Sequence, residues 1–318
     1  MTSNQDKFLI KNAFQQFCHT TNNIKIEKLT GGLSSSELYK CALNNKVYVA
    51  KILNTELENR KNEIVAQIEA ANIKIAPQVY YHDPEYRIMI MDYMNYRSVS
   101  LNEMRNNFLL DAVVETVTKL NKLPTTTSRK SDIIQEIQER YAYLITTNNN
   151  LDAEMNSVIS YVDSFETIVS SCPKILSHGD INPRNIFVKD ENVILIDWET
   201  AGIMPKFFDL AYFSMMCCLD ENSDLHILSK YLGHPVDTKN FKIFKIMKLL
   251  ARASDLFYLL YRLHQQNFNF NSKISDFKDF EYYQRVFADD NHEESQEFLF
   301  AATLSQLNRF LQDVNNLD

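Results

Sequence analysis

The most informative part of the sequence reads His178-Gly179-Asp180-Ile181-Asn182-Pro183-Arg184-Asn185 and continues, after a polar turn, to Ile194-Leu195-Ile196-Asp197-Trp198-Glu199. In the first stretch an aspartate, Asp180, stands five positions before an asparagine, Asn185. The second stretch is an apolar run typical of a strand, and it ends at Asp197. The spacing predicts one loop that presents Asp180 and Asn185, with Asp197 at the end of the following strand.

These side chains match the needs of phosphoryl transfer to a hydroxyl group. A carboxylate must position the hydroxyl and accept its proton, and oxygen ligands must hold Mg²⁺ beside the nucleotide phosphates. Asp180 can serve the first need, and Asn185 and Asp197 can serve the second. The alternative to a catalytic role is a polar loop that precedes an unrelated buried strand by chance.

The first ninety or so residues carry strand patterns. Apolar and polar side chains alternate over residues 37–43 and 46–53 around Asn44-Asn45, which predicts a β-hairpin. Residues 56–71 have a helical period. Further short strands are expected at residues 24–29, 78–81 and 87–91.

After Asp92 the pattern becomes mainly helical. We expect helices over residues 101–123, 131–145, 153–169 and most of the chain beyond Phe208, with a hairpin at residues 186–188 and 193–196. The simplest layout is an α+β, bilobal fold. It has a small β-rich lobe (residues 1–92), a hinge near residues 91–94, and a large α-helical lobe (residues 93–318).

Composition narrows the class of protein further. The net charge of −8, from 33 basic and 41 acidic residues, disfavours nucleic acid as a partner and suits a cationic substrate. The five cysteines show no spacing typical of paired metal ligands, and their number is odd, which favours free thiols in a reducing compartment. Without an apolar leader or a run long enough to cross a bilayer, we expect a soluble, cytoplasmic protein with no membrane span. The sequence does not indicate an oligomeric state.

The two motifs resemble the catalytic loop and the metal-binding segment shared by choline/ethanolamine kinases and aminoglycoside phosphotransferases. The resemblance implies a protein-kinase-like fold, Asp180 as catalytic base, and Asn185 and Asp197 as Mg²⁺ ligands, with His178 supporting the loop. Glu199 looks like the glutamate of the choline-kinase form Asp-Phe/Trp-Glu, which lies near metal and substrate. A surface glutamate is the alternative reading.

The resemblance extends to the nucleotide side of the site. Residues 30–39 look like the family's loop over the phosphates, in which Gly31, Gly32, Ser34 and Ser35 would let backbone amides approach the anion. Ser35 stands where the family has Asn.

A strand lysine, Lys51, resembles the residue that holds the α- and β-phosphates, and Glu63 would be its ion-pair partner. Residues 90–94, with Met91 and Tyr93, would form the hinge that binds adenine. Taken singly, Lys51 could be a solvated strand lysine and Glu63 an ordinary residue at a helix start.

Residues 253–261 indicate where the acceptor alcohol, the compound that receives the phosphate, would bind. Ala253-Ser254-Asp255-Leu256-Phe257-Tyr258-Leu259-Leu260-Tyr261 resembles the choline-kinase segment Ala-Ser-His-x-Phe-Trp-x-x-Trp, whose tryptophans line the choline pocket. Tyr258 and Tyr261 occupy those positions and, at i and i+3, share a helix face. Aromatic faces and carboxylates can hold a quaternary ammonium group, which has no hydrogen-bond donors. A buried core helix remains the alternative.

We therefore expect a kinase that uses ATP and Mg²⁺ to phosphorylate the hydroxyl of an amino alcohol, choline or ethanolamine first. The short interval between Asp197 and Asp209 leaves little room for the peptide-docking segment of a protein kinase. Asp209 matches the family's Asp-Leu/Ile-Ala element and is expected to brace the catalytic loop.

Two other hypotheses remain. One is an aminoglycoside phosphotransferase, for which the acid-rich residues 289–297 could bind ammonium groups. The other is a catalytically silent kinase fold that serves as a binding module. Against it stands the complete set Lys51, Glu63, Asp180, Asn185 and Asp197.

Overall fold

The computed structural model describes residues 3–20, 24–29, 36–95, 99–124, 129, 131–147, 153–189, 192–270, 277–287 and 295–317. Gly31, Gly32, Ser34 and Ser35 lie outside these ranges, as does most of the acid-rich stretch at 289–297.

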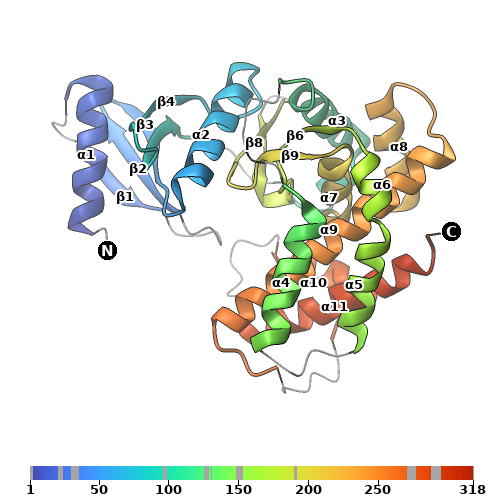
Figure 1. Cartoon of the computed structure of the whole chain (residues 1–318). Helices are drawn as coiled ribbons and strands as arrows, with labels where there is room; N and C mark the ends of the chain where they lie inside the picture. The colour runs from blue at the N-terminus through green and yellow to red at the C-terminus, as the bar shows by residue number, and fades with distance from the viewer. Residues whose placement is uncertain are drawn as a thin grey trace.

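A five-stranded antiparallel sheet forms the N-terminal lobe, with strand order β1-β2-β3-β5-β4 (Figure 1). Its strands are β1 Lys25–Lys28, β2 Glu37–Leu43, β3 Lys46–Ile52, β4 Val79–His82 and β5 Ile88–Asp92. Asn44 and Asn45 have φ angles of 49° and 62°, the values that a two-residue type I′ turn requires. The predicted hairpin is therefore confirmed, together with the other strands expected in this lobe.

Two helices cover opposite faces of this sheet. Helix α1 (Asn4–Cys18), which the sequence pattern did not predict, buries Phe14 in one cluster with Ile90. Helix α2 (Leu57–Asn72) packs Ile64 against Met89. Because neighbouring residues of a strand point to opposite faces, Met89 and Ile90 place α2 and α1 on different sides.

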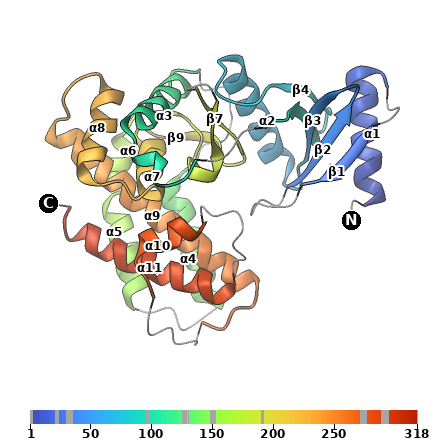
Figure 2. The same cartoon turned by 180° about the vertical axis from the view of Figure 1, so that it is seen from behind.

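The C-terminal lobe is mostly helical (Figures 1 and 2). Its larger helices are α3 Asn107–Leu120, α4 Ile133–Thr147, α5 Ala153–Ser164, α7 Phe208–Met216, α8 Glu221–Leu232, α9 Thr238–Gln265, α10 Phe280–Phe287 and α11 Gln296–Val314. In the part of the chain that the structure covers, no helix combines the length and apolarity needed to span a bilayer.

Two predicted helices are each divided. The segment 101–123 begins as a short 3₁₀ turn, and Asn106 then starts α3 by accepting a hydrogen bond from the Phe108 N–H at 2.9 Å. An asparagine that caps a helix in this way also ends the turn before it. The segment 153–169 breaks at Phe165 into α5 and α6 (Glu166–Ser171).

Two small antiparallel sheets frame the catalytic motif. The predicted hairpin is present as β7 (Ile186–Lys189) and β8 (Asn192–Leu195). The second sheet, not predicted, pairs β6 (Lys174–Ser177) with β9 (Gly202–Pro205). The motif starts where β6 ends, so both sheets fix the ends of the loop.

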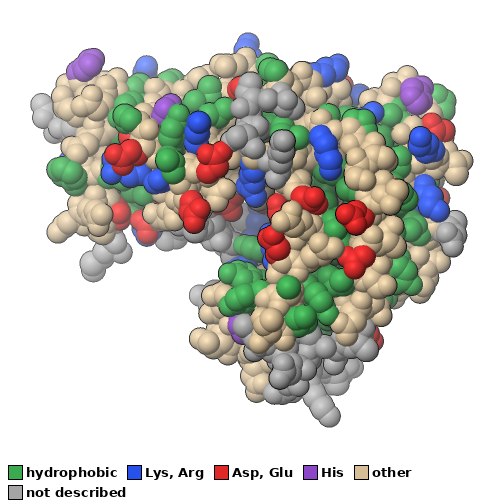
Figure 3. Space-filling model, viewed as in Figure 1, with side chains coloured by type: hydrophobic (Ala, Val, Ile, Leu, Met, Phe, Trp, Pro, Cys, Tyr) green, Lys and Arg blue, Asp and Glu red, His purple; other side chains and the backbone are tan. Residues whose placement is uncertain are grey.

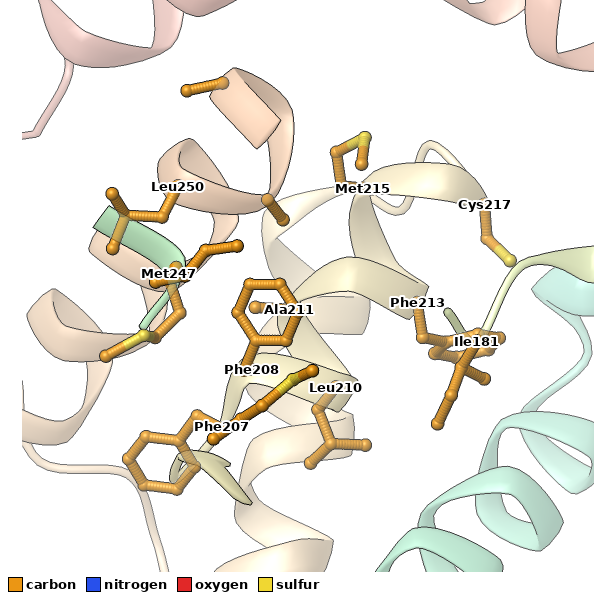
Figure 4. Packing of buried hydrophobic residues seen from close by; sticks show 14 of the residues in the cluster. Ile181, Phe207, Phe208, Leu210, Ala211, Phe213, Met215, Cys217, Met247 and Leu250 are labelled. Atoms are coloured by element: carbon orange, nitrogen blue, oxygen red, sulfur yellow. The ribbon is translucent and has the colours of Figure 1, made fainter. Parts of the chain in front are cut away.

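The core of this lobe surrounds α9, which packs against α4, α7 and α11. Figure 4 shows part of the buried cluster, including Phe208 and Phe213 of α7 and Met247 of α9. Ile181, from the middle of the catalytic motif, is fully buried in the same cluster. The loop is thus anchored to the core by an apolar side chain between its polar ones.

Candidate active site

A cleft of about 1020 Å³ is lined by residues of both lobes, and a hollow is visible between the N-terminal lobe and the lower helices in Figure 3. The cleft collects many side chains that the sequence pattern predicted. They are Lys51, Met91, Tyr93, Asp180, Asn185, Asp197, Glu199 and Tyr258.

Asp209 braces the catalytic loop from α7, as its position in the sequence indicated. Its two carboxylate oxygens accept hydrogen bonds from the backbone N–H groups of His178 and Gly179, both at 2.9 Å. Gly179 has a φ of +83°, which favours glycine, and a Cβ there would lie 2.8 Å from the Thr200 carbonyl oxygen. The loop therefore depends on one buried carboxylate and one glycine.

His178 supports the loop as a neutral imidazole. Burial lowers the pKa of its ring. Its Nδ1 accepts from the Asp180 N–H at 3.3 Å, and its Nε2 lies 3.0 Å from the Ile196 carbonyl oxygen. Since a carbonyl can only accept, the network assigns the proton to Nε2. His178 thereby ties the loop to the strand that leads to Asp197.

Asp180 faces the cleft within a set of neutral donors. Asn182 Nδ2 donates to Oδ1 and Asn185 Nδ2 donates to Oδ2, each at 2.9 Å. The hydroxyl of Tyr212 also donates to this carboxylate. Burial raises the pKa of Asp180, which makes it a stronger base than a solvated aspartate. This arrangement can orient a hydroxyl and take its proton.

Lys51, Glu63 and Asp197 form a compact ion-pair group, named here the lysine cluster. Lys51 Nζ lies 2.7 Å from Glu63 Oε1 and 2.8 Å from Asp197 Oδ1. The Lys51 and Glu63 side chains are 5% and 3% exposed, whereas Asp197 is 29% exposed to the cleft. Burial opposes the charge on Lys51, but the carboxylates of Asp197 and Glu63 prevail and raise its pKa. Glu63 therefore acts through Lys51, and the cluster keeps a fixed cation at the edge of the cleft.

Asn185 and Asp197 can together hold a divalent cation. Both line the cleft, and Asn185 uses its amide nitrogen on Asp180, which leaves its side-chain oxygen for another ligand. No group of three or more His, Cys, Asp and Glu side chains gathers into a metal site among the described residues. Mg²⁺ is commonly held by one or two protein oxygens together with the phosphates of its nucleotide, and this pair fits that pattern.

The sequence profile described as choline/ethanolamine kinase matches residues 26–240. The chain belongs to the choline/ethanolamine kinase family. A curated relative, Protein LicA of Haemophilus influenzae, is 20% identical over 166 residues, which are 51% of this chain and 62% of LicA. For a second LicA sequence of that species the matched share of the relative is 49%, so the chain spans only part of the curated relatives' length.

Solved structures share the fold over nearly the whole chain. A choline/ethanolamine kinase family protein from Mesorhizobium loti has a TM-score of 0.69 at 19% identity, and the match covers 94% of this chain and 99% of that one. A choline kinase from Cryptosporidium parvum has a TM-score of 0.71 at 14% identity, covering 98% and 96%. The expected protein-kinase-like, bilobal fold is therefore confirmed.

The two tyrosines of α9 that were predicted to line the acceptor pocket face different parts of the structure. Tyr258 lines the cleft, but Tyr261 is not among the lining residues. Its ring instead contacts Tyr143 of α4, with centroids 5.3 Å apart. Positions i and i+3 on a helix differ by about 60° in direction, enough for a neighbouring helix to take one of them. The described residues thus do not include a cage formed by this pair.

Glu199 and the two expected hinge residues, Met91 and Tyr93, all line the cleft. Glu199 lines the cleft, and its backbone oxygen accepts from Arg129 at 2.7 Å. Met91 is the next-to-last residue of β5, and Tyr93 follows that strand with Lys40 Nζ 4.5 Å from its ring centroid.

Three further residues of the site were not predicted from the sequence. Asn182 caps the turn at 183–185 while it donates to Asp180, Tyr212 donates to Asp180 from α7, and Asp255 lines the cleft from α9. Asn182 was visible inside the motif, two positions after the aspartate. The segment 253–261 also contained a signal for Asp255, because it stands where the choline-kinase segment has histidine.

Proposed function

We propose that this chain transfers the γ-phosphate of ATP to the hydroxyl group of a small amino alcohol, for which choline and ethanolamine are the reference compounds. The observation that carries the proposal is Asp180, a half-buried base at the cleft surface whose donors Asn182, Asn185 and Tyr212 are all neutral. Membership of the choline/ethanolamine kinase family supports the acceptor class.

In the proposed mechanism Asp180 receives the acceptor's hydroxyl as a further donor and takes its proton as the oxygen attacks phosphorus. The amides of Asn182 and Asn185 hold both carboxylate oxygens in place while the proton moves to the carboxylate, the acceptor oxygen bonds to the γ-phosphorus and the bond from that phosphorus to ADP breaks. His178 and Asp209 fix the backbone beneath them. Phosphoryl transfer requires that the reacting groups be oriented and that phosphate charge be stabilised. Asp180 and the residues that hold it provide the orientation.

On the nucleotide side, Lys51 would bind the α- and β-phosphates while Glu63 keeps it extended. Asn185 and Asp197 would hold Mg²⁺, which neutralises phosphate charge when bound. Glu199 would lie near metal and acceptor, and Met91 and Tyr93 would contact adenine. The loop residues Gly31, Gly32, Ser34 and Ser35, which lie outside the described residues, would contact the phosphates through their backbone amides. Residues 1–92 would then form the nucleotide lobe and residues 93–318 the catalytic and acceptor lobe.

The test is ADP release from Mg-ATP with choline, ethanolamine or kanamycin, for wild type and Asp180→Asn. We expect amine-dependent release that falls by about a thousandfold in the variant, because Asn cannot take the proton. Glu154→Gln, a charge removal on the exposed first turn of α5, serves as the control and should behave as wild type. ADP release with kanamycin but not with choline or ethanolamine would show that the acceptor is an aminoglycoside. No release with any compound would refute the proposed function.

A further inference from the structure

Helix α9 contributes Asp255, Tyr258 and Arg262 to the lining of the cleft, and these residues are named here the α9 wall. The carboxylate of Asp255 has a neutral hydrogen-bond partner. Asp255 Oδ2 accepts a hydrogen bond from Gln306 Nε2 of α11 at 2.7 Å. Among the described residues, no lysine or arginine nitrogen lies within salt-bridge distance of Asp255. Burial, with the nearby charge of Asp180, raises the pKa of Asp255 to about 6. The group is therefore mostly charged at neutral pH. Arg252 and Arg140 act on its charge from a longer range, but among the described residues no cation pairs with it directly.

A hydrogen bond from Arg252 fixes the orientation of the Gln306 side chain, the partner of Asp255. Arg252 is 3% exposed, and its Nη1 donates to Gln306 Oε1 at 2.6 Å. Because a guanidinium can only donate, it selects the carbonyl side of Gln306 and turns the amide nitrogen toward Asp255. Arg252 itself has a counterion, Asp313, at 3.3 Å. The network thus prepares Asp255 as an acceptor at the surface of the cleft.

The aromatic part of the α9 wall is already in contact with protein cations. The guanidinium carbons of Arg140 and Arg262 lie 5.8 Å and 6.0 Å from the centroid of the Tyr258 ring. Tyr261 lies outside the lining. A quaternary ammonium group relies on aromatic faces, since it has no N–H to donate. An ammonium group with N–H bonds can instead donate to a carboxylate in a charge-assisted hydrogen bond.

We propose that Asp255 binds the ammonium group of the acceptor through its N–H donors, so that this chain prefers amino alcohols of the ethanolamine type over quaternary ones of the choline type. The inference rests on the proposed function and narrows its acceptor. Asp255 is the residue that determines the preference, and Gln306 and Arg252 position it.

The experiment compares kcat/KM for ethanolamine, N-methylethanolamine, N,N-dimethylethanolamine and choline in the ADP-release assay. All four are cations at neutral pH, and only choline has no N–H. A pocket that discriminates by size should lose activity gradually along the series. Discrimination by hydrogen bonding should give a single step of about tenfold or more at the last methyl group, because one charge-assisted bond disappears there.

Asp255→Asn tests the residue itself. We expect it to lower kcat/KM of the three N–H compounds to about the level of choline, with the KM for ATP unchanged, while Glu154→Gln keeps the step. Melting curves show whether the variant is folded; if it is not, the wild-type series decides alone. Equal or better use of choline, a gradual decline, or a step that survives in folded Asp255→Asn would overturn this inference and leave the proposed function intact. Silence with all four compounds would overturn both.

Discussion

The lysine cluster and the α9 wall face the same cleft, but they balance charge differently. In the lysine cluster one cation lies within 2.8 Å of two carboxylates, so each carboxylate has a protein cation in contact although the group keeps one net negative charge. On the α9 wall the Asp255 carboxylate has only a neutral amide at hydrogen-bond distance among the described residues. A carboxylate that is paired inside the protein can remain fixed through a reaction cycle, whereas one without a paired cation gains most from a ligand of opposite charge.

Of the changes that compare these two regions, removing the cation from the lysine cluster should have the largest effect. We expect Lys51→Met to lower turnover by about a hundredfold or more, because the phosphates lose a fixed charge. It should also lower the free energy of unfolding by about 3 kcal/mol, because buried Glu63 loses its partner. Urea unfolding and ADP release measure the two effects.

The double variant Lys51→Met/Glu63→Gln separates them. It should recover most of the lost stability, since a neutral amide replaces the unpaired carboxylate, but none of the turnover. A single variant as stable as wild type would show that Lys51 does not balance the charge of the two carboxylates.

Gly179 offers a smaller, purely steric test of the catalytic loop that both regions adjoin. In Gly179→Ala the new Cβ would meet Met204 Cε at 2.7 Å and the Thr200 oxygen at 2.8 Å, in a residue with φ of +83°. We expect the free energy of unfolding to fall by about 2–3 kcal/mol, and turnover to fall with it because Asp180 moves.

The chain contains a matched control for this change. Gly233 has a φ of +74°, but a Cβ added there would meet no atom within 4 Å. Gly233→Ala should therefore cost only about 1 kcal/mol and leave turnover unaltered. Equal losses in the two variants would mean that backbone strain alone, without the contact at Thr200, explains the requirement for glycine.

The contrast between the two regions also explains what the sequence could predict. Asp180, Asn185 and Asp197 are close in the chain, and a loop followed by a strand is enough to bring them together. Lys51 and Glu63 could be assigned because a strand and the next helix meet in a common arrangement. These relations are local, and the pattern of residues records them.

The α9 wall depends on contacts between segments that are distant in sequence. Gln306 reaches Asp255 only because α11 packs on α9, and nothing in residues 253–261 indicates that partner. Tyr261 was expected in the cleft because it stands at a position where the similar choline-kinase segment has a pocket tryptophan and shares a helix face with Tyr258. The position of α4 decides which tyrosine faces the cleft. Strands β6 and β9 were missed for the same reason, since each is short and recognisable only through its partner.

The smallest predicted effect is a change in the free energy of unfolding when Asp255 is neutralised. Its sign is opposite to that expected for Lys51→Met. Burial raises the pKa of Asp255 from 3.8 to about 6, so the folded chain binds this proton more tightly than the unfolded chain does. The charged form therefore lowers the free energy of unfolding above about pH 6, and this loss disappears as the pH falls toward 3.8. The charged groups that act on it are Asp180 from the loop, Arg252 from α9 and Arg140 from α4.

We therefore expect Asp255→Asn to raise the free energy of unfolding at pH 8 by about 1–2 kcal/mol, although it impairs use of the acceptor. The gain should shrink steadily when urea unfolding is repeated between pH 8 and pH 5, because wild type then takes up the proton that the variant lacks. A gain that does not change with pH would assign the titration to another group. A loss of stability as large as that of Lys51→Met would mean that Asp255 is charge-balanced by the protein after all, and the difference between the two regions would no longer hold.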